Sequence, residues 1–247
     1  RLGEIYGIEV KAFDKHRNRV FYNQHNYIFK KINLTTFIDE VDYIINLPKL
    51  KSHTFLSFTG AVKNFYGCIP GAGKPFGHMK APGPETFSHG LLDIYQFIKP
   101  KILINIMDGI TGLEGAGPGT GGKRKKAGFI SASACALSLD AVCLDQISAL
   151  PHQIYTHRLG LMRNLFSGKT EKNKTLPRVS FQLPKASILV SILNRYIPGL
   201  ALSKPMTDKS RCTRCGCCVK ACPGSAISLQ QYPVFNYKKC IYCFCCH

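Results

Sequence analysis

The chain has 247 residues, of which 45% are hydrophobic, so a wholly disordered protein is excluded. At roughly 100–200 residues per domain, the length allows one large domain or two smaller ones. Lys and Arg number 33 against 14 Asp and Glu, and no run approaches the roughly 18 apolar residues of a membrane-spanning helix, so we expect a basic protein with no transmembrane segment.

The elements predicted along the first 200 residues alternate between strands and helices. Tyr43–Leu47 ends at Pro48 as a buried parallel strand would, and Leu91, Leu92, Tyr95 and Ile98 recur at the spacing of one helix face. The predicted strands are Ile5–Phe13, Arg19–Phe29, Tyr43–Leu47, Lys101–Met107, Gly128–Ser131 and Val179–Leu183. The predicted helices are Phe55–Phe65, Thr86–Ile98, Leu139–Leu150 and Ile188–Tyr196. This alternation predicts a layered α/β body.

Polar residues follow two of the predicted strands, where open α/β sheets place their ligands. Lys49, Lys51, His53, Lys63 and Asn64 come after the first apolar strand. Asp108 immediately precedes a glycine-rich stretch, Gly109–Gly122, that follows the second strand, and Glu114 lies within it. Another such stretch is Gly67–Gly83. Cations and an imidazole would suit a small anionic ligand such as a carboxylate or a phosphate. The alternative is a solvated basic loop.

The glycine-rich stretch also resembles two phosphate-binding patterns. Gly117, Gly119 and Gly122 fit G-x-G-x-x-G, and Gly117 to Lys123 fits G-x4-G-K. The first pattern needs a helix to follow, and the second needs Ser or Thr where Arg124 stands, so we favour a backbone-rich loop or a surface turn. The run Lys123–Lys126 is expected to be a solvated patch. Asp140 and Asp145 lie about 140° apart on a helix and cannot form a pair, so Asp140 is expected to favour the helix dipole.

Nine of the 12 cysteines lie between Cys212 and Cys246. Cys212, Cys215, Cys218 and Cys222 are spaced C-x2-C-x2-C-x3-C and are followed by Pro223, the pattern of bacterial ferredoxins. Three close thiolates ligate one iron–sulfur cube, and the fourth ligates another. Structural zinc has little use for this spacing, and an evenly stapled disulfide scaffold is not indicated.

The pattern repeats at an offset of 28 residues in Cys240, Cys243 and Cys246. One 4Fe-4S cluster is therefore predicted to have a full ligand set, Cys222, Cys240, Cys243 and Cys246. The other has Cys212, Cys215 and Cys218, because the fourth position of the repeat lies beyond His247. We expect a C-terminal truncation, or else a fourth ligand from Cys217, Cys245 or His247.

Three segments of the body also resemble a known family. Residues 46–67 (from Asn46-Leu-Pro-Lys to Gly67), 108–119 and 139–145 are similar to the family called domain of unknown function 362, an iron–sulfur-associated α/β family of bacteria and archaea. The resemblance implies a C-terminal ferredoxin module joined by a proline-containing linker, here Leu183-Pro184 to Lys204-Pro205. It also implies that further residues precede Arg1. It supplies no substrate.

Together these observations predict an α/β domain over residues 1–203 and a small, ferredoxin-like (α+β) iron–sulfur module over residues 204–247. We expect a cytoplasmic redox protein that passes single electrons through two 4Fe-4S clusters to or from its body, a redox partner protein or a larger redox complex. The alternative is an oxidoreductase whose body binds a small anionic substrate or cofactor, with the clusters as relay. No nucleic-acid-binding module is recognisable.

Overall fold

The computed structural model describes residues 2–13, 16–71, 73–81, 83–117, 121–167, 178–184, 205–220, 222, 225–240 and 246. The chain divides into two compact units, of residues 1–71 with 83–186 and of residues 72–82 with 187–247. We call the first unit the body and residues 205–247 the cysteine module. Within the described residues, no helix combines the length and the apolar character that crossing a bilayer requires.

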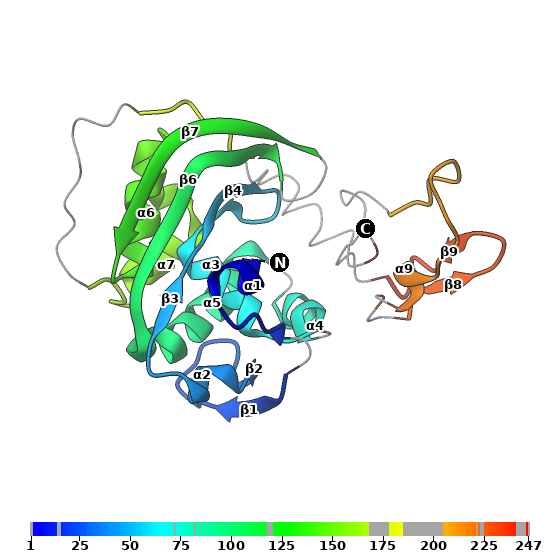
Figure 1. The fold of residues 1–247 in the computed structure, drawn as a ribbon, viewed down its shortest axis with the longest axis horizontal. Coiled ribbons are helices and arrows are strands. Elements are labelled where there is room, and N and C mark those ends of the chain that lie inside the picture. Colours follow the sequence, from blue (N-terminus) through cyan, green and yellow to red (C-terminus); the bar gives the residue numbers. More distant parts are fainter. Residues whose placement is uncertain are drawn as a thin grey trace. The chain divides into compact units, whose positions relative to one another are not determined.

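The body contains both strands and helices (Figure 1). Its strands are β1 (Asn18–Tyr22), β2 (Lys31–Thr35), β3 (Ile44–Asn46), β4 (Lys49–His53), β5 (Ser57–Thr59), β6 (Ile102–Ala116) and β7 (Gly121–Ser133). Its helices are α1 (Leu2–Tyr6), α2 (Phe37–Glu40), α3 (Ala61–Asn64), α5 (Pro84–Ile98), α6 (Ala136–Gln146) and α7 (Tyr155–Met162). The predicted layered α/β class is confirmed.

Strand β6 is the centre of the main sheet. β7 runs antiparallel along one edge of β6, and Asn105 pairs with both Ser133 of β7 and Asn46 of β3. β3 therefore occupies the opposite edge, where it is parallel to β6, and β4 follows it along the same edge. β5 pairs antiparallel with β4 on the outside, and β1 and β2 form a separate hairpin.

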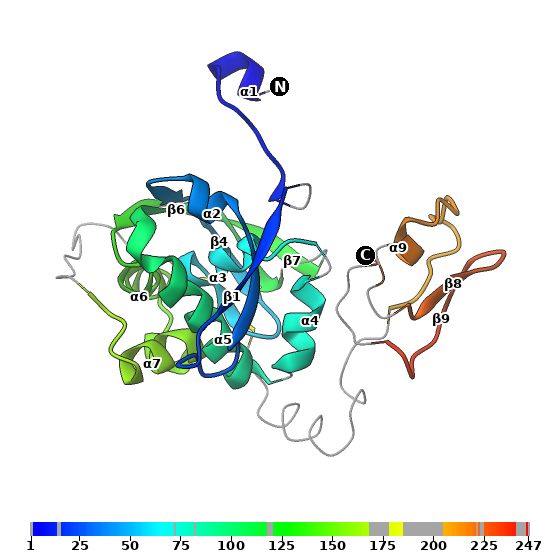
Figure 2. The same ribbon diagram turned by 90° about the horizontal axis from the view of Figure 1, so that it is seen from below.

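Helices cover one face of this sheet, which we call the inner face. α3 and α6 pack on β6, α6 also contacts β7, and α5 packs against α7. The helices α5 and α7 lie behind the strands in Figure 1 and below them in Figure 2. On the other face, the outer face, Ile45 of β3 and Ile130 of β7 are 56% and 60% exposed. β3 is therefore a parallel strand as predicted, but it is not buried on both faces within the described residues.

Helix α5 confirms the clearest of the sequence predictions. Leu91, Leu92, Tyr95 and Ile98 are all buried, as their spacing predicts. The helix begins two residues earlier than expected, at Pro84, because proline needs no partner for its missing N–H in the first turn. The hydroxyl of Thr86 accepts a hydrogen bond from the N–H of Gly83 and so caps the first turn.

Several other predictions are wrong in type or extent. Residues 5–13 contain the end of α1 and no strand, the second strand stops at Tyr22, and Phe55–Phe65 is divided between β5, α3 and the start of a 3₁₀ turn. The stretch Gly67–Gly83 includes helix α4 (Gly73–Lys80), and most of Gly109–Gly122 forms strands β6 and β7. Residues 179–183 form no regular strand, and the predicted helix 188–196 lies outside the described residues. The predicted helix at 139–150 is α6, which begins and ends earlier.

A buried carboxylate fixes helix α3 against α6. Asp140 of α6 accepts hydrogen bonds from the N–H groups of Ala61 (2.6 Å) and Val62 (3.1 Å), the first two residues of α3. Asp140 therefore caps a different helix, and the expectation that it favours the dipole of its own helix is wrong in that respect. Burial raises the pKa of Asp140 to about 7, although both N–H bonds oppose the shift.

Gly60, just before α3, leaves room for this carboxylate. A Cβ atom at Gly60 would collide with the carboxylate of Asp140 and the ring of Phe58. We expect Gly60→Ala to lower the free energy of unfolding by about 1–3 kcal/mol, because neither neighbour can withdraw without loss of packing or of the cap. Gly67→Ala is the matched control, since nothing lies within 4 Å of the added atom. Equal urea midpoints for the two variants would contradict the prediction.

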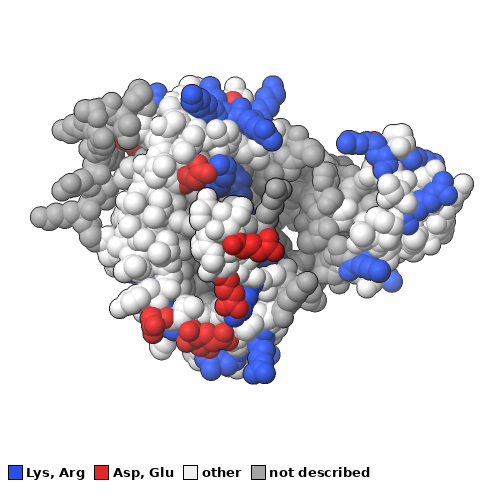
Figure 3. Space-filling view, viewed as in Figure 1, with Lys and Arg blue, Asp and Glu red and all other residues white. Residues whose placement is uncertain are grey.

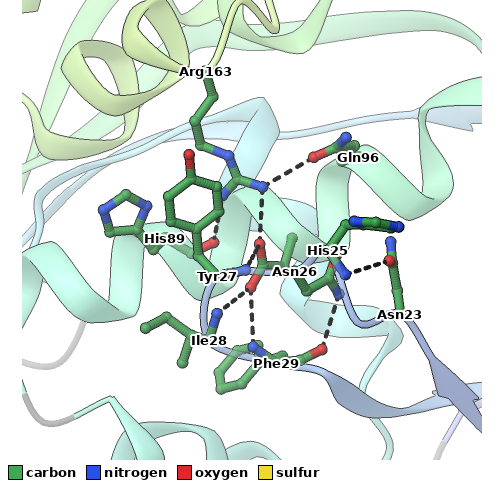
Figure 4. A network of polar contacts seen from close by, with 10 residues as sticks. Asn23, His25, Asn26, Tyr27, Ile28, Phe29, His89, Gln96 and Arg163 are labelled. Carbon is green, nitrogen blue, oxygen red and sulfur yellow. Dashed lines mark hydrogen bonds and ion pairs between the residues drawn. The ribbon is translucent and has the colours of Figure 1, made fainter.

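The loop between β1 and β2 is held on α5 by a second buried acid (Figure 4). Asp93 accepts hydrogen bonds from the N–H groups of Tyr27 (3.1 Å), Ile28 (2.8 Å) and Phe29 (3.0 Å). Arg163 donates to the same carboxylate at 2.8 Å from just beyond α7. This network explains why residues 23–29, the second half of the predicted strand Arg19–Phe29, form a loop.

The cysteine module contains helix α9 (Cys217–Lys220) and a hairpin of β8 (Ile227–Leu229) and β9 (Pro233–Phe235). Arg214 and Gly216 have positive φ angles of 59° and 72°, which turn the chain sharply between the first cysteines. Ile227 of β8 is buried, whereas Leu229 is 45% exposed.

Candidate functional site

Lys49 and Lys51, which follow the first predicted apolar strand, lie on strand β4 and not in the solvated loop that was the alternative. Leu50 and Ser52 are fully buried on the inner face, so Lys49, Lys51 and His53 share the outer face by the two-residue period of a strand. The sequence of residues 49–53 has the alternation of a half-buried strand, but the preceding Pro48 and the charged side chains argue against a strand there. The structure therefore brings these three predicted residues to one face.

Lys49 and Asp108, which are 59 residues apart in the chain, form an ion pair with 2.6 Å between Nζ and Oδ2. The hydrogen bond from Lys49 is the main reason why the pKa of Asp108 is lowered. Both side chains are about half exposed, so the pair contributes little stability. It shows that β4 and β6 bring one residue of each candidate group together.

A hollow of about 370 Å³ lies beside this pair, lined by Lys49, Lys51, Thr111, Gly112, Leu113 and Arg124. Arg124 is exposed on β7. The run Lys123–Lys126 was predicted to be a solvated patch, which did not indicate that Arg124 lines the hollow. No acidic side chain of the described residues forms an ion pair with Lys51 or Arg124. In Figure 3, basic side chains gather at the top of the body, over the β6–β7 hairpin.

Lys63 lies close enough to this group for Lys51 to affect its titration. Burial, assisted by repulsion from Lys51, lowers the pKa of the Lys63 amine to about 8. An amine with such a pKa is partly neutral near physiological pH, a property of lysines that act as bases or nucleophiles.

We expect Lys63→Met to raise the free energy of unfolding at pH 7 by roughly 1–3 kcal/mol, because it removes a cation that burial disfavours. An unfolded lysine has a pKa near 10.4. Between about pH 8 and pH 10 the unfolded chain therefore holds a proton that the folded chain has released, and native stability rises with pH. The advantage of the variant should shrink over this window in urea titrations. Lys30→Met, on the exposed surface, should show no such trend; a parallel trend there would contradict the prediction.

The remaining predicted residues of the body have structural partners. Nδ1 of His53 accepts hydrogen bonds from the N–H groups of Phe55 and Leu56, which closes the turn between β4 and β5. Glu114 accepts a hydrogen bond from the N–H of Gln182. Because Leu113 lines the hollow on the outer face, Glu114 points to the inner face and is not part of that group.

Asn64 belongs to a chain of three asparagines that sequence reasoning did not find. Asn64 donates to Oδ1 of Asn46 (2.7 Å), and Asn46 donates to Oδ1 of Asn105 (2.9 Å). Asn105 in turn donates to the carbonyl of Ser133 on β7. The only signal in the sequence was an asparagine near the end of each apolar strand. The chain joins α3, β3, β6 and β7 across the buried side of the sheet.

The cysteine module offers thiols with no disulfide among its described residues. Cys215 is exposed, and Cys212, Cys218, Cys222, Cys240 and Cys246 are partly exposed. Sγ of Cys222 accepts a hydrogen bond from the N–H of Ala226 at 3.2 Å, the kind of contact that supports a metal-bound thiolate. Within the described residues, no three potential ligands converge into a metal-holding group, and Cys243, Cys245 and His247 lie outside them.

The donor set nevertheless fits an iron–sulfur cluster, since it consists of accessible thiols on a tightly turned loop. Cys212, Cys215, Cys218 and Cys222 would hold iron through Sγ, as would Cys240, Cys243 and Cys246. A bound 4Fe-4S cluster supplies reversible single-electron chemistry. The chain itself supplies the turn at Arg214 and Gly216 and the N–H bond to Cys222.

Comparison with known families decides the classification. Residues 205–228 match the family described as 4Fe-4S binding domain, and residues 2–145 match the family described as Domain of unknown function (DUF362). The chain belongs to the DUF362 family. Both parts of the predicted resemblance are thereby confirmed, and this DUF362 protein carries a 4Fe-4S ferredoxin-type domain.

A curated relative gives a further comparison. The DUF362 protein is 38% identical over 138 residues to the thylakoid-associated protein sll1697 of Synechocystis sp.. The matched region covers 54% of this chain and 42% of that relative, so the chain spans less than half of the relative's length. No solved structure matches the chain.

Proposed function

We propose that this DUF362 protein is an iron–sulfur redox protein. It would act in a reducing compartment, the cytoplasm, and its two domains would meet near residues 203 and 204. Its cysteine module exchanges single electrons with the body or with a partner. The observation that carries the proposal is the C-x2-C-x2-C-x3-C-P run within the matched 4Fe-4S domain. The repeat of three cysteines at an offset of 28 residues supports two clusters, the one with Cys212 lacking its fourth ligand in this sequence.

The charge of the module supports a partner with an acidic docking face. The described residues 205–240 carry one acid, Asp208, and six cations, namely Lys209, Arg211, Arg214, Lys220, Lys238 and Lys239. Arg214 and Lys209 both lie over the ring of Tyr232, at 5.0 and 5.7 Å from its centroid. Ordered cations beside a redox centre would steer an acidic redox protein or complex, and the rate should fall with ionic strength.

The test is the content of iron and acid-labile sulfide per chain after anaerobic purification, with EPR of the reduced protein. About four irons with sulfide are expected if only the cluster with four cysteines on the repeat forms, and about eight if Cys217, Cys245 or His247 completes the other. Zinc without sulfide would overturn the proposal.

A second function is favoured by the hollow beside Lys49 and Asp108. The body would be an oxidoreductase that binds a small anionic substrate or cofactor, with the clusters as electron relay. Lys49, Lys51 and Asp108 of the predicted set support it by their positions, and Lys63 supports it by its lowered pKa. A small molecule that remains bound after anaerobic purification would favour this function over electron transfer alone.

A further inference from the structure

The hollow on the outer face arises from a break in the pairing of β4 with β6. Lys49 pairs with Asp108 and Lys51 pairs with Leu113, so β4 advances by two residues while β6 advances by five. The pairing of β6 with β7 has a second irregularity, between Gly109 and Thr111 of β6. The extra residues of β6 include Thr111 and Gly112, both of which line the hollow. Such bulges re-aim side chains and are frequent beside binding sites.

The side chains at this break carry a net positive charge. Lys49 is neutralised by Asp108, which leaves Lys51 on β4 and Arg124 on β7 as two cations without acidic partners among the described residues. Arg124 lies opposite Leu113 in the β6–β7 ladder, and Leu113 lies opposite Lys51 in the β4–β6 ladder. The two cations therefore stand in one row across three strands, on the same face.

We propose that this hollow binds a dianionic oxyanion group of the phosphate class, held by Lys51 and Arg124 with the hydroxyl of Thr111. The excess of two positive charges matches a dianion better than a single carboxylate. Arginine offers paired donors that match the oxygens of a phosphate, and lysine offers a mobile point charge. The volume of about 370 Å³ exceeds a bare oxyanion, so the hollow leaves room for the organic group that carries it.

The site is distinct from a glycine-rich phosphate cradle. Residues 109–116, predicted to be a loop, form part of β6, and β7 follows where a nucleotide loop would need a helix. The cations, rather than a row of backbone N–H groups at a helix start, supply the attraction. The inference deepens the second function proposed above, because it names the chemical class of that ligand.

The experiment is calorimetric titration of the iron-loaded chain with inorganic phosphate and with acetate, at pH 8 and constant ionic strength. We expect saturable phosphate binding, with an affinity about tenfold lower in Arg124→Gln and in Lys51→Gln. Acetate should bind the unaltered chain about tenfold more weakly than phosphate does. Lys123→Gln is the matched control. Lys123 is the exposed neighbour of Arg124 on β7, it does not line the hollow, and its removal should change the affinity less than about twofold.

Two results would overturn the inference: no saturable binding of phosphate, or equal losses in Arg124→Gln and Lys123→Gln, which would show unspecific screening. Thermal melts of each variant separate lost binding from lost folding. Iron is measured in the same samples. Full iron content without phosphate binding would contradict only this inference. Phosphate binding in a chain that never holds iron would contradict only the proposed electron transfer.

Discussion

Replacing Asp93 by asparagine should lower the free energy of unfolding of the body by about 3–5 kcal/mol, one of the two largest effects that we expect. The carboxylate is fully buried, and the side chain of Arg163 is only 5% exposed. The amide of an asparagine keeps the shape but loses the charge, and its NH₂ group cannot accept the bonds from Ile28 and Phe29. A buried guanidinium is then left without a counter-ion.

The variant also loosens the loop that the carboxylate holds. The ring of Phe29 packs so closely on α5 that a Cβ atom at Gly90 would collide with it. Arg163 further donates to the carbonyl of His89 and lies over the ring of Tyr27 at 4.4 Å. Loss of the central acceptor therefore affects β1–β2, α5 and the end of α7 together.

Chemical denaturation followed by circular dichroism measures the effect. Asp42→Asn, at an exposed acid, is the control and should change the free energy of unfolding by less than about 0.5 kcal/mol. The double variant Asp93→Asn with Arg163→Met should recover part of the loss, because no unpaired charge remains. Equal stabilities of Asp93→Asn and Asp42→Asn would show that the network contributes little.

The same network marks a limit of prediction from sequence. Local composition favours a strand over residues 19–29, and nothing nearby reveals an acid 64 residues away that captures three N–H groups of the segment. Helix α5 was predictable because its apolar face and its capping residues lie within its own length. The boundaries of β6 and β7 were not, because a glycine-rich stretch is extended here by pairing between strands rather than by propensity.

The candidate site divides in the same way. Lys49, Lys51 and Asp108 could be grouped from the sequence as polar residues that follow predicted strands, and in the structure Lys49 forms an ion pair with Asp108. Arg124 could not be assigned, because its place depends on the register of β7 against β6. Glu114 is a candidate from the sequence because it is an acid near Asp108. The irregular register of β6 against β4 places Glu114 and Asp108 on opposite faces of the sheet.

The other large effect is expected at Cys222. Replacing Cys222 by serine should remove the cluster for which we propose a full ligand set, about four irons and their sulfide. In the ferredoxin pattern the cysteine before proline ligates the cluster of the other triplet, here Cys240, Cys243 and Cys246. Sγ of Cys222 accepts a hydrogen bond from the N–H of Ala226, a contact that would stabilise a metal-bound thiolate.

Cys217→Ser is the matched control, because Cys217 is an exposed thiol in the same module but lies outside the C-x2-C-x2-C-x3-C spacing. It should keep its iron, sulfide and EPR signal. A loss of iron in Cys217→Ser together with a normal content in Cys222→Ser would reverse the assignment and identify Cys217 as a ligand. Because the body has its own core, circular dichroism of its helices should be unchanged in both variants, so that lost iron reports ligation and not general unfolding.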